Sequence, residues 1–204
     1  MNLGACTTLQ RWPETGTWYR AVPLTVLATA LSSAHSKTAR TRFNPGALLP
    51  ANRQFEILYF AEDPLTANFE CGAMLGNSFV PGGAIAHPCR SFAMLNAQMT
   101  LSEVVDLTDV SASQLPLQTT AQEMTGDWDG YQVRGGMTSV SAPVGVAPTQ
   151  ALGQALFQTG VEGFQPVSAR VSCNRTLMVF PQNLRSGSKL EFRDQSGAIV
   201  HQIP

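Results

Sequence analysis

The stretch from Arg42 to Glu70 constrains the fold more than any other part of the chain. A turn signal, Phe43-Asn44-Pro45-Gly46, is followed by the apolar run from Phe55 to Ala61. A short apolar run bounded by turn residues predicts a buried strand. Asp63-Pro64 follows at once, and Asp suits a helix N-cap while Pro suits the first helical position. The sequence therefore predicts a buried strand that leads directly into a helix.

The remaining elements are predicted to be short and irregularly mixed. The helix after Asp63 should bury Leu65, Phe69 and Ala73, with Glu70 at the edge of this apolar stripe. Short strands interspersed with few helices indicate an α+β fold with a small mixed sheet. We expect strands over 17–22, 97–107 and 176–180, and helices over 24–33 and 148–157. Loops are expected over 76–88 and 128–136. A C-terminal hairpin should join 190–193 to 198–203 around Ser196-Gly197.

Length and charge bound the class of protein. A chain of 204 residues with 44% hydrophobic residues can bury one core, so we expect a single domain over residues 16–204 after an N-terminal arm of residues 1–15. The net charge of −1 does not favour nucleic acid or an acidic membrane surface. No apolar run is long enough to span a bilayer.

The cysteines and histidines do not predict a metal site. Cys6, Cys71, Cys89 and Cys173 form no C-x-x-C pair, and His35, His87 and His201 are scattered. The first residues lack the basic and apolar regions of a secretory signal. We therefore expect a cytoplasmic protein with free thiols and no metal.

Two arginines are candidate anion-binding residues. Arg20 and Arg42 each stand beside an aromatic residue in an apolar or turn context, where an arginine is costly unless it is paired. Pairing with a structural carboxylate is one interpretation. The other is bidentate binding of a phosphate group. Arg40 is a weaker substitute for Arg42.

Glu70, Tyr59 and Ser168 are the other candidates. A carboxylate in a cleft of low dielectric stabilises a developing cation, although a glutamate at the edge of a helix stripe is more often solvated or paired. Tyr59 could stack on a ligand ring or belong to the core. No nucleophile elbow surrounds Ser168, so we expect it to donate a hydrogen bond to substrate or to Glu70.

Several common sites are missing from the sequence. It contains no Walker A loop, no G-x-G-x-x-G motif and no interleaving of basic and aromatic residues for nucleic acid. Asp127-Trp128-Asp129 could suggest paired carboxylates or a metal ligand set. The neighbouring glycines favour a surface loop instead.

An ordered set of short blocks along most of the chain resembles the RES-domain family, named after an arginine, a glutamate and a serine. That family supplies toxins of bacterial toxin–antitoxin pairs, and its characterised members act on NAD+. The blocks are Tyr19-Arg20, Arg42-Phe43-Asn44-Pro45, Leu58 to Glu62, Pro64 to Glu70, Leu107-Thr108-Asp109, Asp127-Trp128, Pro148-Thr149-Gln150, Gly163-Phe164, Ser168 and Val179-Phe180-Pro181.

The resemblance implies a compact α+β domain related to ADP-ribosyltransferase toxins, with NAD+ as substrate and no metal. Its site residues fall on Glu70, Tyr59 and Arg42 as catalytic residues, and on Arg20, Arg42, Tyr59 and Ser168 as substrate-binding residues. Cleavage of the nicotinamide–ribose bond, with water or inorganic phosphate as acceptor, would deplete NAD+ and arrest growth.

Departures from the family pattern and other functions stay open. Thr41 stands where a glycine is common, and the stretches 46–57 and 72–98 are elaborated, which leaves substrate access and partner docking undetermined. ADP-ribosyl transfer to a protein would use the same cleft, and an inactive NAD-binding module is the alternative without catalysis. The resemblance implies an Xre-like antitoxin as partner, without direct nucleic-acid or membrane binding, and leaves a homodimer open.

Overall fold

A strongly curved sheet organises the molecule in the computed structural model, which describes residues 1–29, 32–77, 80–131, 144–193 and 198–204. Within these residues, seven strands pair in the order β1-β2-β7-β6-β5-β8-β9, and β1 also pairs with β5, so five of them close into a ring. The strands are β1 (Trp12–Pro23), β2 (Leu58–Ala61), β5 (Phe92–Asp106), β6 (Gly163–Gln165), β7 (Thr176–Val179), β8 (Lys189–Arg193) and β9 (Ile199–Ile203).

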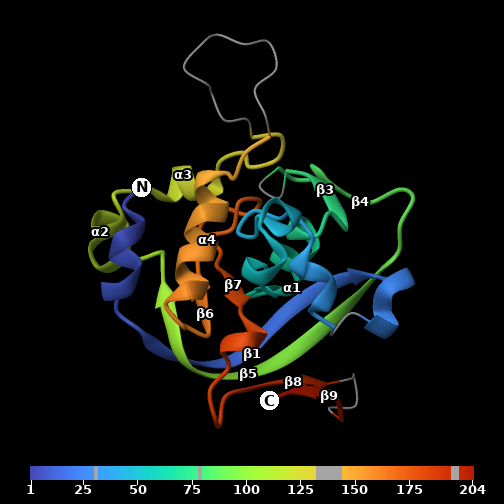
Figure 1. The fold of residues 1–204 in the computed structure, drawn as a ribbon. Coiled ribbons are helices and arrows are strands. Elements are labelled where there is room, and N and C mark those ends of the chain that lie inside the picture. Colours follow the sequence, from blue (N-terminus) through green and yellow to red (C-terminus); the bar gives the residue numbers. More distant parts are fainter. Residues whose placement is uncertain (30–31, 78–79, 132–143, 194–197) are drawn as a thin grey trace.

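The antiparallel ribbon of β1 and β5 is the longest pairing in the described sheet. It runs from Trp12 opposite Val104 to Pro23 opposite Phe92, with one irregularity near Trp12. The two strands lie side by side beneath the helices in Figure 1, with β8 and β9 below them. The expected strands over 17–22 and 97–107 are therefore confirmed as parts of longer ones, although β5 ends one residue earlier, at Asp106. The ribbon carries Arg20 into the sheet next to β2, because Tyr19 also pairs with Ala61.

Strands β2 and β7 separate two apolar clusters, because successive side chains of a strand point to opposite faces. Leu58 and Phe60 pack with Trp18, Met99 and Phe192 on one face. Tyr59 packs on the other face, against a cluster that contains Phe43, Phe55, Phe164 and Phe180 together with Leu152 and Leu156 of α4 (Pro148–Gln158). The α+β class predicted from the sequence is thus observed, and so is the helix expected over 148–157.

The first residues of the chain belong to the second cluster. A 3-10 turn, Leu3–Thr8, precedes β1, and Cys6 and Leu9 are buried against the α4 side of the sheet. Strand β1 begins at Trp12, inside the stretch 1–15 for which the sequence suggested an arm.

Helix α1 (Pro64–Glu70) begins as the sequence predicts. The side chain of Asp63 accepts a hydrogen bond from the Thr66 amide at 3.0 Å, and Pro64 takes the first turn. Leu65, however, is 45% exposed, so its predicted place in the core is wrong. The buried stripe includes Thr66, Phe69 and Ala73 instead, because the Thr66 hydroxyl is satisfied by Asp63 and Asn174.

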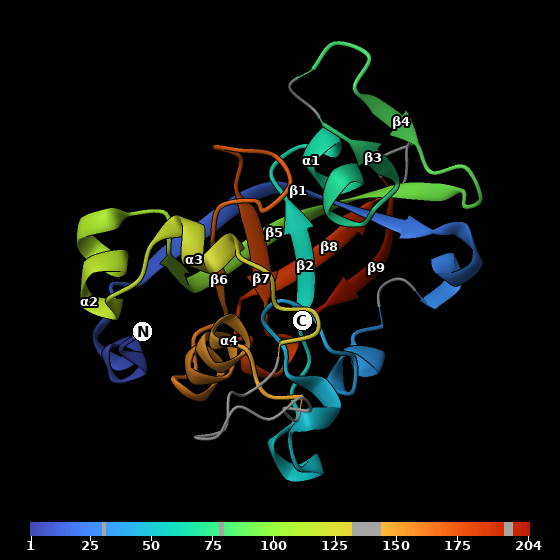
Figure 2. The same cartoon turned by 90° about the horizontal axis from the view of Figure 1, so that it is seen from above.

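Other differences from the sequence predictions concern short elements. Residues Leu24–Thr29 form a 3-10 turn rather than the first part of a helix to Ser33. The expected loop over 76–88 contains part of a small hairpin, β3 (Met74–Gly76) with β4 (Ala84–Ala86), which lies to one side of the sheet in Figure 2. Unpredicted elements are β6, the π-turn Val110–Gln114, α2 (Leu115–Leu117) and α3 (Ala121–Thr125).

The C-terminal hairpin is confirmed. Strands β8 and β9 pair antiparallel, with Leu190 opposite Ile203 and Phe192 opposite His201. Its expected turn at Ser196-Gly197 lies outside the described residues, as do residues 132–136 of the expected irregular segment. β7, the strand expected over 176–180, pairs with β2 on one side and β6 on the other.

Candidate active site

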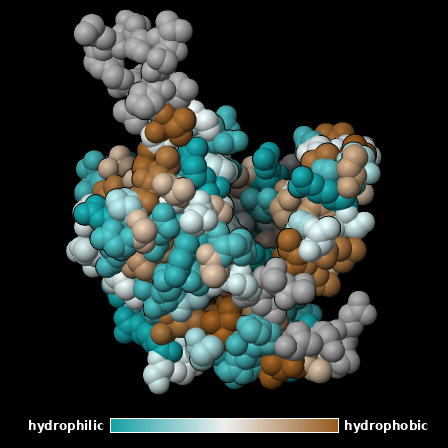
Figure 3. All heavy atoms as spheres, turned by 45° about the vertical axis from the view of Figure 1, so that its right-hand side comes forward, coloured by the Kyte–Doolittle hydropathy of each residue, from teal (hydrophilic) through white to brown (hydrophobic). Residues whose placement is uncertain are grey.

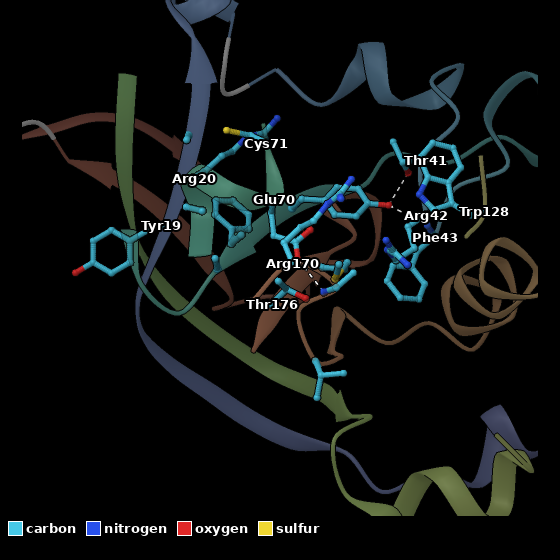
Figure 4. Close-up of a pocket in the computed structure, with 18 residues that line it drawn as sticks. Tyr19, Arg20, Thr41, Arg42, Phe43, Glu70, Cys71, Trp128, Arg170 and Thr176 are labelled. Atoms are coloured by element: carbon cyan, nitrogen blue, oxygen red, sulfur yellow. Dashed lines mark hydrogen bonds between the residues drawn. The ribbon is translucent and has the colours of Figure 1, made fainter. Parts of the chain in front are cut away.

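A cavity of about 320 Å³ opens beside the ends of β1 and β2. Its walls come from these strands, from α1, from the turn at residues 41–43, and from two loops that contribute Trp128 and Arg170. Figure 4 shows these side chains converging from segments far apart in the sequence, and Figure 3 shows one hollowed face of the molecule. The sequence candidates Arg20, Arg42, Tyr59 and Glu70 all line this one cavity.

The turn that carries Arg42 is held by the buried Asn44. Its side-chain amide donates to the carbonyls of Ser36 at 2.6 Å and Phe55 at 3.2 Å, and its Oδ1 accepts from the Gly46 amide at 2.9 Å. Gly46 has φ +57°, and a Cβ there would lie 2.5 Å from the Thr38 carbonyl oxygen. The Asn-Pro-Gly signal therefore builds a rigid support for Arg42, because only glycine fits this close and left-handed position.

Helix α4 presses on the same turn from the other side. The Gln150 side chain donates to the Thr41 carbonyl at 2.9 Å and accepts from the Ala147 amide at 3.0 Å. A Cβ on Gly153 would lie 2.0 Å from the Phe43 carbonyl oxygen, so the helix approaches the turn backbone as closely as a glycine allows. The turn with Arg42 thus has little freedom to move.

The Arg42 side chain is bonded to backbone rather than to a carboxylate. Its Nη1 donates to the carbonyl of Gly126 at 2.8 Å and more weakly to that of Met124 at 3.4 Å. Burial lowers the pKa of Arg42, and the negative charge of Glu70 opposes this shift. Arg42 therefore fastens the segment after α3 to the cavity wall.

Arg20 is a half-buried cation that forms no ion pair with a described residue. Its guanidinium carbon lies 6.0 Å from the centre of the Phe60 ring, and its Nη1 is buried with no hydrogen-bond partner among the described residues. Burial lowers the pKa of Arg20 to about 10, while Cys71 acts in the opposite direction, so the side chain stays protonated at neutral pH. A buried charge with no partner is costly, which suggests that an anion belongs there.

Tyr59 is fixed by its hydroxyl group. This oxygen hydrogen bonds with Thr41 Oγ1 at 2.5 Å and accepts from the Phe43 amide at 3.1 Å. Burial raises the pKa of Tyr59 to about 12, so it is a neutral phenol at physiological pH. The ring is thereby anchored at one end and contributes its side to the cavity.

Glu70 is oriented by the loop between β6 and β7. Its Oε1 accepts from Ser168 Oγ at 2.5 Å and from the Ala169 amide at 2.9 Å. The Ser168 oxygen in turn accepts from the amides of Arg170 and Val171 at 3.1 and 3.0 Å. No described residue donates a hydrogen bond to Oε2, so one carboxylate oxygen is fixed and the other is free.

The structure places Ser168 behind the cavity rather than on its surface. Ser168 is 5% exposed and does not line the cavity, whereas the carboxylate that it holds does. Arg40 does not line the cavity either, and its Nε and Nη2 are buried without a partner in the described chain. Of the two roles that the sequence suggested for Ser168, the geometry favours the bond to Glu70.

Three cavity residues were missed as site candidates. Cys71 follows Glu70 directly, Arg170 follows Ser168 by two positions, and Trp128 lies in the stretch interpreted as a surface loop. Proximity along the chain to Glu70 and Ser168 was the available signal for the first two. Arg170 is the third guanidinium at the cavity and lowers the pKa of Arg42 by charge repulsion.

No metal site is visible in the described part of the chain. It contains no group of three or more His, Cys, Asp or Glu side chains that could hold an ion. Cys71, Cys89 and Cys173 are exposed free thiols, and Cys6 is a buried one. Among the described residues no helix has the length and apolarity needed to cross a membrane.

Comparison with known proteins assigns the family. A chain in the crystal structure of the M. tuberculosis MbcT–MbcA toxin–antitoxin complex superposes with a TM-score of 0.59 at 18% sequence identity, over 94% of this chain and 88% of that one. This likeness concerns the fold. No curated protein matches the sequence. The RES domain model matches residues 17–199, which include every site residue described above. The chain therefore belongs to the RES-domain family.

Proposed function

We propose that the protein is an NAD+-degrading toxin that cleaves the bond between nicotinamide and ribose. The observation that carries the proposal is the presence, in one cavity, of a half-buried arginine without an ion pair and of an oriented carboxylate. Among the described residues, the buried Nη1 of Arg20 has no hydrogen-bond partner, and only one oxygen of Glu70 accepts a hydrogen bond. A dinucleotide offers a pyrophosphate to the first and a developing ribosyl cation to the second.

The reaction requires little proton transfer. When the C1′–N bond breaks, its electron pair stays on the pyridinium nitrogen, and nicotinamide leaves as a neutral molecule. Positive charge accumulates on the ribose, and an oriented carboxylate stabilises it. Water or inorganic phosphate then bonds to C1′. A single carboxylate suffices, whereas ordinary glycosidases use two.

Each site residue has a role in this scheme. Glu70 stabilises the oxocarbenium-like transition state through its free oxygen. Arg20 binds the pyrophosphate, and Arg42 adds positive charge while it holds the segment after α3. The anchored Tyr59 ring stacks on nicotinamide or its ribose. Ser168 positions Glu70 and does not itself contact substrate.

The fold likeness supports the biological setting. The related structure is a toxin–antitoxin complex, and its fold is matched over nearly the whole chain. We infer that this chain is likewise paired with an antitoxin and arrests growth by depleting NAD+ in the cytoplasm. A relation to ADP-ribosyltransferase toxins belongs to the same proposal, since these also stabilise a ribosyl cation with a carboxylate.

The test is NAD+ turnover by the purified chain and by its Glu70→Gln variant, with and without inorganic phosphate. The amide keeps the size of the side chain and can still accept from Ser168, but it removes the charge. We expect nicotinamide release from wild type and a loss of at least about 100-fold in the variant, comparable with removal of a strong electrostatic contribution.

The products decide between the alternatives. ADP-ribose identifies water as acceptor, and its 1-phosphate identifies phosphate. A labelled ADP-ribosyl group found on protein would replace this proposal with ADP-ribosyl transfer. NAD+ that binds but is never cleaved, under any of these conditions, would indicate an inactive binding module.

A further inference from the structure

Trp128 is a large aromatic side chain in the cavity wall without a structural role of its own. It lines the cavity and is half-buried, yet it belongs to none of the apolar clusters. Within the described chain its ring stacks on no other ring, and its indole N–H donates to no acceptor. A tryptophan face that the core does not use is available to a planar ligand.

The segment that carries Trp128 is nevertheless attached to the cavity wall. Helix α3 ends just before it, and Met124 of this helix is fully buried in the core. Two residues before Trp128, the Gly126 carbonyl accepts from Arg42 Nη1 at 2.8 Å. The backbone that leads to Trp128 is therefore held at two points, by the packing of Met124 and by the hydrogen bond from Arg42. Figure 4 shows Trp128 beside Thr41 and Arg42, at the end of the cavity away from Arg20 and Cys71.

The oriented carboxylate decides which ring of a dinucleotide fits this end. Positive charge develops on the nicotinamide ribose, so this part of the ligand belongs at Glu70. Near Trp128 the charges are mixed, because Arg42 and Arg170 are cationic and Asp127 is an anion that acts on Arg42. A neutral purine needs no counter-ion and stacks well on both tryptophan and guanidinium faces. With the nicotinamide ribose at Glu70, the purine is the ring left for the Trp128 end of the cavity.

We propose that Trp128 forms the adenine subsite of the cavity, with Arg42 as the residue that positions it. This inference rests on the proposed NAD+ function for the nature of the ligand. It orients the dinucleotide, with the nicotinamide ribose at Glu70, the pyrophosphate between the arginines, and the adenine against Trp128. It also assigns an indirect role to Arg42, which holds the segment 126–128 and thereby positions Trp128.

The experiment follows tryptophan fluorescence in the Glu70→Gln protein during titration with ADP-ribose, AMP and nicotinamide separately. We expect ADP-ribose and AMP to quench the signal and nicotinamide to leave it unchanged. Trp128→Phe should remove the quenching, and Trp128→Leu should weaken ADP-ribose binding measured by calorimetry about 10-fold, as for loss of one stacked base. Trp12→Phe is the matched control, because Trp12 is half exposed on β1 and does not line the cavity.

Two results would overturn the subsite. One is quenching of Trp128 by nicotinamide but not by ADP-ribose. The other is an unchanged ADP-ribose affinity in a Trp128→Leu protein whose thermal unfolding matches that of its parent. These measurements record binding and do not depend on catalysis. A wild-type chain that leaves NAD+ intact would refute the proposed reaction, but it would not change the result of the ADP-ribose titration.

Discussion

Ser168 and Glu70, 98 positions apart in the sequence, share a hydrogen bond of 2.5 Å between Oγ and Oε1. The serine is buried and its oxygen also accepts two backbone amides of its own loop. The Ser168 oxygen therefore stabilises the loop and, through the same loop, orients the Glu70 carboxylate. Ser168 thus supports Glu70 in the geometry seen at the cavity.

Substitution Ser168→Ala should lower kcat for NAD+ cleavage about 10- to 100-fold and change KM little, because it frees the carboxylate to rotate without removing a substrate contact. The free energy of unfolding should fall by about 1–2 kcal/mol, since the amides of Arg170 and Val171 lose their acceptor. Ser172→Ala, at an exposed position of the same loop, is the control. A variant with raised KM and normal kcat would instead indicate that Ser168 binds substrate.

Arg20 should reveal a conflict between stability and function. The buried Nη1 of Arg20 has no hydrogen-bond partner in the described part of the chain, so replacing the guanidinium with an unbranched apolar chain, Arg20→Met, should raise the free energy of unfolding by about 1–2 kcal/mol. The same change should lower the affinity for NAD+ at least about 10-fold, because the pyrophosphate loses a charged partner. Urea denaturation and calorimetric titration in the Glu70→Gln background measure the two effects.

The control for Arg20 is Arg53→Met, which alters an exposed arginine outside the cavity. It should leave ligand affinity and stability within about 0.5 kcal/mol of the parent. A destabilised Arg20→Met protein with unchanged affinity would show that the arginine serves the fold rather than an anion.

Local signals in the sequence were sufficient for the parts of the fold that local chemistry decides. Asp63-Pro64 specifies the start of α1, and Asn44-Pro45-Gly46 specifies the turn below Arg42. The unbroken apolar runs over 58–60 and 177–179 follow from burial on both faces of a central sheet. The pocket set of Arg20, Arg42, Tyr59 and Glu70 came from the ordered blocks that resemble the family, not from any single motif.

Contacts between segments far apart in the chain could not be predicted from the sequence. The closure of β1 on β5 and the bond between Gln150 and Thr41 depend on register and on helix placement. Trp128 was interpreted as part of a surface loop because glycines flank it, yet Arg42 and Met124 bring that segment to the cavity. The short hairpin of β3 and β4 has mostly exposed residues, so its sequence lacks the alternation of apolar and polar residues that predicts a strand.

Helix α4 should tolerate no side chain at Gly153. Alanine normally stabilises a helix by about 1 kcal/mol relative to glycine. Here the added Cβ would meet the Phe43 carbonyl oxygen at 2.0 Å, so helix and turn must separate. We expect Gly153→Ala to lower the free energy of unfolding by about 2–3 kcal/mol and to weaken NAD+ binding, because the turn that carries Arg42 shifts. Gln158→Ala at the exposed end of α4 should be neutral. Gain of stability in Gly153→Ala would contradict the close contact.

Tyr59 should contribute to the loss of stability at alkaline pH. Its pKa is raised from 10 to about 12 by burial, so the folded protein keeps a proton that the unfolded chain releases. The stabilisation by the neutral phenol is fully present below pH 10 and disappears as the pH rises through 12. Tyr59→Phe should cost about 1–2 kcal/mol at neutral pH, because the Phe43 amide loses its acceptor, but should decline less steeply between pH 10 and 12. Urea denaturation across this range, with Tyr19→Phe as control, makes the comparison. Parallel pH profiles for wild type and Tyr59→Phe would mean that the Tyr59 hydroxyl titrates as it does in the unfolded chain.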